Sequence, residues 1–307
     1  MPEERTAASD GPALPVRSSG LSGRLASSPL RLQHCEAVRL DSSAVDTHVH
    51  LNQPRLFRRL DDVLARARAA GVSDMVVVGY DLASSETAVQ LAQGHPGLWA
   101  SVGIHPHDAK DMDRASAGRL RELAGRPRVV AIGETGLDFY RDLSPRDLQR
   151  DAFLRHLELA AELHLPVICH CRDAEDAVLD LLVRWPHLTR AWHCFAGDLA
   201  LARAAAAAGI RLGVGGTVTY PNAHRLRHVV AETPLDCMLL ETDAPYLAPY
   251  LNDGTRPRGN EPAYVLAVAE RIAEIKAEPL ATVLAVTSAN ARQVFLLGEP
   301  KGASEDS

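Results

Sequence analysis

No uncharged apolar run in the 307-residue sequence approaches the roughly 20 residues that a bilayer-spanning helix requires. The sequence therefore gives no sign of a membrane anchor. Positive charge is not in excess either, because 33 lysines and arginines stand against 39 aspartates and glutamates, for a net charge of −6. This balance argues against a broadly basic coat for nucleic acid. A metal site can still attract phosphate locally, because bound cations dominate the field around them.

The sequence also lacks a disulfide framework. Its five cysteines are an odd number without the spacing of paired half-cystines: Cys35, Cys169, Cys171, Cys194 and Cys237. Cys169 and Cys171 are one residue apart in an expected strand, where a bridge would distort the backbone severely. Four of the five lie in apolar strand-like runs, where small buried thiols are common. A reducing cytoplasm is the simplest compartment.

The first 43 residues have no sustained apolar period. They are rich in Ser, Ala, Pro, Gly and Arg, and they lack the apolar core of a secretory signal. We expect a flexible extension over residues 1–43, a single domain over residues 44–297 and a disordered tail over residues 298–307.

From Ala44 onward, apolar strand-like runs alternate with helical segments. The expected strands cover residues 44–50, 74–79, 98–103, 129–133, 166–170, 189–193, 210–214 and 237–241. Alternating units imply a parallel sheet, and eight of them in roughly 250 residues fit an α/β fold of the (β/α)8 TIM-barrel type. The alternative is an open doubly wound sheet, whose Gly-x-Gly-x-x-Gly marker is absent after the first strand. We therefore predict the barrel.

Ligand-type side chains stand where several of these strands end. Glu134 follows an apolar run closed by Gly133, and an unpaired buried carboxylate costs on the order of several kcal/mol, so it needs partners. Side chains alternate along a strand, so His48 and His50 point to the same side. Active sites of such barrels lie at the carboxyl ends of the strands. We expect six ligands to meet there: His48, His50, Glu134, His170, His193 and Asp243.

Four imidazoles and two carboxylates suit two divalent ions such as zinc, manganese or magnesium. In this interpretation Glu134 bridges the ions, the histidine pair of the first strand completes one, and His170 and His193 complete the other. Asp243 binds the first ion or takes the proton of the attacking water as a general base. A single histidine is more often a hydrogen-bonded core or surface residue, but the pair on one strand face favours a metal.

Other side chains near the strand ends are candidates for substrate contacts. His105 lies in the loop after the third strand, where it contacts a substrate phosphate or a metal ligand, or is purely structural. Arg141 and Arg172 follow the fourth and fifth strands, and a guanidinium can bind phosphate with its planar fork. Pairing with neighbouring aspartates is the alternative for both. Three aromatic residues can stack on a base or pack over the barrel rim: Tyr140, Phe195 and Tyr246.

Six short blocks of the sequence resemble those of the TatD family of metal-dependent hydrolases. They are DTHVHL at 46–51, GIHPH at 103–107, IGETGLD at 132–138, HCRDA at 170–174, HCFAG at 193–197 and ETDAPYL at 241–247. The resemblance covers about residues 44–297. It implies a two-metal TIM-barrel enzyme, usually described as a deoxyribonuclease acting on DNA ends, with a bridging glutamate. The family usually reads Arg-Gly-Lys-Arg-Asn-Glu-Pro in a later loop, whereas residues 258–262 lack the Lys-Arg pair, which bears on substrate preference.

The predicted function is a deoxyribonuclease of the 3′-5′ exonuclease type. It would hydrolyse phosphodiester bonds of DNA ends or single-stranded DNA through a water activated by two metals, as a monomer in the cytoplasm. One alternative is an amidohydrolase acting on a C–N or ester bond of a small metabolite. Many such enzymes bridge their metals with a modified lysine on the fourth strand, where this chain has Glu134. A non-catalytic barrel is the other alternative, although none of the six expected ligands is missing.

Overall fold

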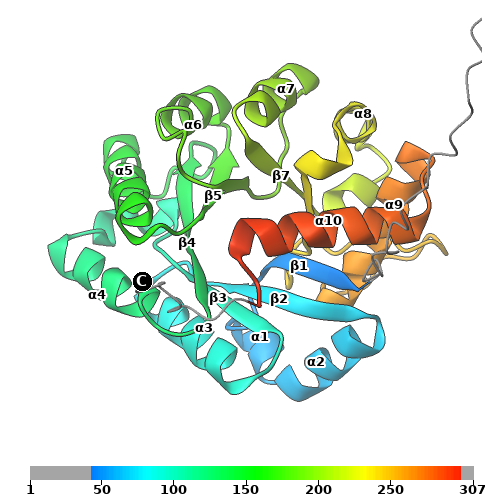
Figure 1. The fold of residues 1–307 in the computed structure, drawn as a ribbon, viewed down its shortest axis with the longest axis horizontal. Coiled ribbons are helices and arrows are strands. Elements are labelled where there is room, and N and C mark those ends of the chain that lie inside the picture. The colour runs from blue at the N-terminus through cyan, green and yellow to red at the C-terminus, as the bar shows by residue number, and fades with distance from the viewer. Residues whose placement is uncertain (1–42, 299–307) are drawn as a thin grey trace, which may run out of the picture. The chain divides into compact units, whose positions relative to one another are not determined.

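The computed structural model describes residues 43–298, so the extension and tail predicted for residues 1–43 and 298–307 lie outside the described residues except at Ser43 and Gly298. Parallel strands form one eight-stranded sheet in sequential order (Figure 1). They are β1 (Ala44–Val49), β2 (Val72–Val78), β3 (Leu98–Val102), β4 (Val129–Asp138), β5 (Val167–Arg172), β6 (Arg190–Trp192), β7 (Ile210–Val214) and β8 (Met238–Leu240). The predicted alternation is therefore confirmed.

The sheet closes between β1 and the segment that follows β8. An isolated parallel bridge joins Val49 to Ala244. The His50 N–H donates to the Ala244 carbonyl at 2.8 Å, and the Asp243 N–H donates to the His48 carbonyl at 2.9 Å. This closure brings the two ends of the sheet together and confirms the (β/α)8 barrel.

Helices surround the strands (Figure 1). They are α1 (Pro54–Phe57), α2 (Leu60–Ala69), α3 (Leu82–Gly94), α4 (Arg114–Ala124), α5 (Arg146–Leu163), α6 (Glu175–Leu182), α7 (Leu199–Ala207), α8 (His224–Glu232), α9 (Val265–Lys276) and α10 (Leu280–Phe295). Short 3-10 turns span Pro106–Asp111, Gly216–Thr219, Leu235–Cys237 and Pro262–Tyr264. Within residues 43–298, no helix combines the length and apolarity needed to cross a membrane.

The start of α3 is fixed by an aspartate rather than by the serine that follows it. Serine is a common N-cap residue, but Asp81 caps the helix and Ser84 lies in its first turn. The Ser84 N–H donates to Asp81 Oδ1 at 2.6 Å, and the Asp81 N–H donates to Ser84 Oγ at 2.9 Å. This reciprocal capping box satisfies two backbone donors at once, which a serine cap alone cannot do.

Strand β4 is longer than the apolar run predicts. Instead of ending at Gly133 it continues to Asp138, because residues 135–138 pair with residues 169–172 of β5 after a register shift. Glu134 therefore lies within the strand rather than beyond its end. The extension also carries Asp138 to the same end of the barrel.

Two apolar layers follow from the alternation of side chains. On β5, Ile168 points into the barrel, whereas Val167 and Cys169 pack under the helices. The inner cluster contains one or two residues from most strands together with part of α10: Val45, Val76, Val78, Val130, Ala131, Ile168, Ala191, Leu239, Ala291, Val294 and Phe295. Most of these strand residues are near strand starts, so α10 covers that end of the barrel. The opposite end is free for chemistry.

His156 on α5 is fully buried and uses both ring nitrogens. Its Nε2 accepts from the Ile104 N–H at 3.0 Å, and its Nδ1–H donates to the Ala152 carbonyl at 2.7 Å. Burial lowers the pKa of His156 from 6.5 to about 4, against a smaller opposing effect of the hydrogen bond to Ala152. Protonation would remove the acceptor that Ile104 needs. The neutral ring is therefore part of the folded structure.

Because the unfolded chain takes up this proton first, stability falls as the pH drops from about 6.5 toward 4. We expect wild-type protein to lose about 2 kcal/mol more unfolding free energy than His156→Gln between pH 7.5 and pH 5. Urea unfolding at both pH values measures the difference. His164→Gln changes an exposed histidine at the end of the same helix and should keep the wild-type pH dependence. An equal pH dependence in His156→Gln and wild type would contradict the assignment.

Candidate metal centre

Four of the six expected ligands form one compact cluster. His48 in β1 and His50, which directly follows that strand, have their Nε2 atoms 3.3 Å apart. These atoms lie 3.4 and 3.8 Å from Glu134 Oε2. His50 Nε2 is also 3.3 Å from Asp243 Oδ1, in the segment after β8. The structure therefore brings together the residues that the sequence assigns to the first ion.

The other carboxylate oxygen of Glu134 faces a second cluster. Glu134 Oε1 lies 2.9 Å from His170 Nδ1 and 3.6 Å from His105 Nε2. The remaining nitrogen of His170 contacts Asp138 Oδ2 at 3.2 Å, and His107 Nε2 contacts the same oxygen at 2.9 Å. Glu134 thus presents one oxygen to each of two histidine clusters, which is the arrangement that a bridging carboxylate needs.

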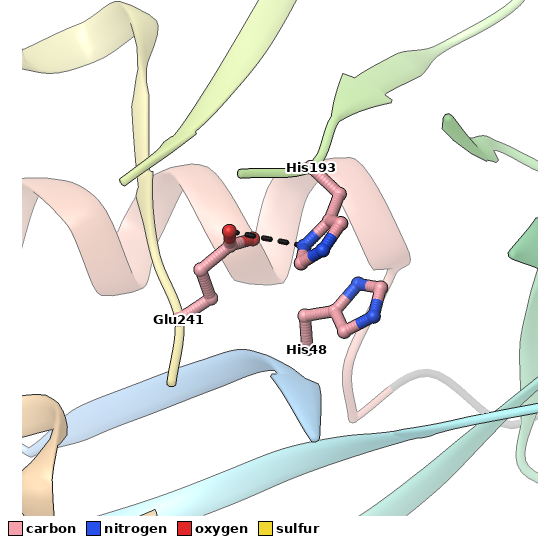
Figure 2. A group of neighbouring side chains, drawn as sticks. All are labelled: His48, His193 and Glu241. Carbon is pink, nitrogen blue, oxygen red and sulfur yellow. Dashed lines mark ion pairs between the residues drawn. The ribbon is translucent and has the colours of Figure 1, made fainter. Parts of the chain in front are cut away.

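His193 lies closer to the first cluster than to His170. Its ring stacks on His48 with centroids 3.5 Å apart and an interplanar angle of 20° (Figure 2). Its Nε2 is 4.0 Å from Asp243 Oδ1. The ring centroids of His193 and His170 are 6.5 Å apart, whereas those of His105 and His170 are 4.4 Å apart. The pairing of His170 with His193 around one ion stays a prediction.

Glu241 is a site residue that the sequence interpretation missed. It reaches His193 from the end of β8, with Oε1 3.0 Å from His193 Nδ1 (Figure 2), and the same oxygen accepts from the Cys194 N–H at 2.6 Å. Gly213 makes room for it, since a Cβ there would lie 2.4 Å from Glu241 Oε2. The alternation of side chains along β8 could have indicated Glu241. Leu239 points into the barrel, and Glu241, two residues further along, points to the same side.

The backbone of β1 is held in place by the buried carboxylate of Asp46. It accepts from the Thr242 N–H at 2.9 Å and the Thr242 hydroxyl at 2.6 Å, and also from the His48 N–H at 3.2 Å. The β1–β2 register shifts between Asp46 and Val49, and such irregularities re-aim side chains beside active sites. Asp46 therefore ties the histidine strand to the segment that carries Asp243.

Proton affinities in the cluster reflect burial and close charges. Burial alone would raise the pKa of Glu134, but His105 and His48 outweigh it and lower that pKa well below its usual range. Burial would lower the pKa of His193, yet Glu241 raises it to about 10. The pKa of His48 is lowered by burial and by His193. Without a cation, the cluster thus combines a charged Glu134 with two imidazoles whose pKa values are shifted in opposite directions, downward for His48 and upward for His193.

The donor set fits divalent cations. Three groups have ligand atoms that all lie within 4.8 Å of one another: His48–His50–Glu134, His105–Glu134–His170 and His48–His193–Glu241. In addition, His48 Nδ1 is buried without a hydrogen-bond partner. Imidazole and carboxylate are ligands that zinc and manganese accept, and a shared Glu134 permits two neighbouring ions.

A cavity of about 610 Å³ opens beside the cluster. His105, Arg141 and Arg172, the three residues predicted to contact substrate, all line it. The Arg172 guanidinium lies 3.9 Å from the ring centroid of Tyr140, which is 61% exposed. Tyr246 also lines the cavity, whereas Phe195 is buried against Trp192. Of the three candidate aromatics, only Tyr140 and Tyr246 are open to a ligand.

Comparison with known proteins is consistent across sequence and fold. Residues 45–296 match the family model described as TatD related DNase. The chain is 45% identical over 240 residues to the 3′-5′ ssDNA/RNA exonuclease TatD of Cronobacter sakazakii, covering 77% of this chain and 91% of that protein. It is 39% identical over 252 residues to the uncharacterized metal-dependent hydrolase YabD of Bacillus subtilis, covering 81% and 98%. The crystal structure of YjjV, a TatD homolog from Escherichia coli K12, superposes with a TM-score of 0.77 at 30% identity, covering 84% and 99%.

Proposed function

The chain belongs to the TatD family of metal-dependent hydrolases, and on this premise we propose that it is a 3′-5′ exonuclease that removes nucleotides from single-stranded DNA. The observation that carries the proposal is Glu134, whose two oxygens face separate histidine clusters beside an open cavity. Such a centre suits in-line attack at phosphorus. The relative from Cronobacter sakazakii carries that activity in its name.

In this proposal two divalent ions are held by His48, His50, Glu134, His170, His193 and Asp243. When bound, they supply activation of a water and stabilisation of the charge on the reacting phosphate. Asp243 acts as general base. Burial would raise its pKa, but the hydrogen bond from His50 and the nearby His193 lower it, so the carboxylate is charged and able to accept a proton at neutral pH. His50 thus both orients the Asp243 carboxylate and lowers its pKa.

The cavity supports binding of a strand end. Arg141 and Arg172 line it and can bind phosphate oxygens with their planar guanidinium groups, while His105 approaches from the side of Glu134. A chain with a net charge of −6 does not offer a broadly basic surface for long duplexes. These features favour a single-stranded end over an internal duplex site.

We also propose a single catalytic domain over residues 44–297, active as a monomer in the cytoplasm. The domain limits follow from β1, which begins at Ala44, and α10, which ends at Phe295. The described cysteines, Cys169, Cys171, Cys194 and Cys237, are all free thiols, which suits a reducing compartment.

The position of a label on a single-stranded oligonucleotide tests the polarity. With Mn²⁺ present, we expect a 3′-terminal label to be released as a mononucleotide at once, and a 5′-labelled strand to shorten stepwise. An inverted 3′-terminal nucleotide should block both reactions, because no 3′ end can enter the cavity. Early release of the 5′ label, or cleavage of the blocked strand at internal positions, would contradict the proposal. Gel analysis of timed samples distinguishes these outcomes.

A further inference from the structure

Three side chains form a stack between the loops that follow β7 and β8. The Arg256 guanidinium lies 4.5 Å from the ring centroid of Tyr220 and 5.6 Å from that of Tyr250. The two rings meet edge to face, with centroids 5.9 Å apart. Arg256 Nη2 donates to the Tyr220 hydroxyl at 2.6 Å, and Nε donates to the Ala248 carbonyl at 2.9 Å. We call this group the Tyr220–Arg256–Tyr250 clamp.

The clamp holds an arginine in one orientation without neutralising it. Arg256 is exposed, and no carboxylate lies within ion-pair distance of it among residues 43–298. Its Nη1 makes no hydrogen bond within the same range, so this nitrogen can still donate to a ligand. A fixed guanidinium with a free Nη1 between two aromatic rings matches the chemistry that binds a nucleic-acid backbone and its bases.

The clamp is attached to the loop that lines the cavity. Leu247 lines the cavity, and Arg256 donates to the carbonyl of the next residue, Ala248. The Tyr250 N–H donates to Thr219 Oγ1 at 2.8 Å, which ties this loop to the one after β7. A strand whose end occupies the cavity can therefore continue over the clamp.

We propose that the Tyr220–Arg256–Tyr250 clamp binds the single strand upstream of the nucleotide held in the cavity. The free Nη1 of Arg256 contacts a backbone phosphate, and the tyrosine rings provide a face for a base. The clamp thereby determines how strongly binding depends on strand length. This inference rests on the proposed exonuclease function and names the residues that hold the part of the strand not being cleaved. The clamp lies just before residues 258–262, where the sequence departs from the usual family pattern.

Binding of labelled dT12 and dT3 in the presence of EDTA tests the clamp without cleavage. We expect Arg256→Gln to weaken dT12 binding about tenfold while changing dT3 binding less than twofold, as measured by fluorescence anisotropy. The slope of log K against log salt for dT12 should become shallower by about 0.7, the effect of one phosphate contact on a single strand. Arg256→Lys keeps the charge and should restore the salt slope. Arg203→Gln, an exposed arginine on α7, should behave as wild type.

Several outcomes overturn the inference. The inference is wrong if Arg256→Gln binds dT12 as tightly as Arg203→Gln does. It is also wrong if Arg256→Gln loses affinity for dT3 and dT12 to the same extent, because that result indicates a general disturbance of the loop. Wild-type protein that binds neither oligonucleotide also overturns it. The proposed function fails separately: protein that binds dT12 through Arg256 but releases no nucleotide with Mn²⁺ retains the clamp and loses the exonuclease.

Discussion

Glu134→Gln will lower kcat for nucleotide release by about 1000-fold or more while the barrel remains folded. The substitution keeps the size of the side chain but removes its charge. It also replaces one of two equivalent oxygens by an amide that only donates. Glu134 Oε2 faces His48 and Oε1 faces His170, so at least one histidine cluster loses its shared acceptor. Several kcal/mol of stabilisation of the reacting phosphate depend on that shared ligand.

Steady-state release of nucleotides from single-stranded DNA measures this effect. Near-ultraviolet circular dichroism and thermal unfolding show whether the variant is folded. Glu122→Gln changes an exposed glutamate on α4 and should retain wild-type activity. If folded Glu134→Gln keeps more than a tenth of the wild-type rate, Glu134 does not bridge the reacting centre.

Removal of metal ions by a chelator will abolish activity and lower the unfolding temperature by about 5–10 °C. Four buried or nearly buried imidazoles lie within 4.0 Å of Glu134 or Asp243, and bound cations would offset the negative charges of these two carboxylates. Adding Mn²⁺ or Zn²⁺ back should restore both properties. Thermal unfolding and nucleotide release, followed over one metal titration, measure both effects. A chelated protein that stays fully active would exclude metal-dependent catalysis.

The affinity for metal ions should rise with pH, because protons compete with the cation for the histidine nitrogens. Burial would lower the pKa of His193, but Glu241 raises it to about 10; the pKa of His50 is likewise raised by Asp243 against burial. His193 therefore holds a proton near neutral pH in the metal-free protein, and a cation must displace this proton. Calorimetry in two buffers of different ionisation enthalpy measures the released protons.

Glu241→Gln should weaken metal binding about 10–100-fold, because Glu241 orients His193.

Much of the centre was predictable because strand periodicity is a local property. His48 and His50 share a face since they are two residues apart. His170 follows Ile168 into the barrel for the same reason, whereas Cys169 packs under the helices. The order of apolar runs was sufficient for the (β/α)8 fold. The same rule applied to Leu239 would also have indicated Glu241.

Contacts between distant strand ends were not predictable from local pattern. His105 lies nearer to His170 than His193 does, and Asp138 reaches both His170 and His107 because β4 extends along β5. The Tyr220–Arg256–Tyr250 clamp joins residues up to 36 positions apart.

The sequence by itself determined the strand order, the inward face of each strand and the residue types offered at its end. Only the tertiary structure decided which of those side chains meet, since that depends on barrel closure, on the irregular register of β1 and on the length of β4. The physical reason is that alternation is set by each residue's own backbone geometry, whereas the distance between two strand ends is set by the packing of the whole barrel.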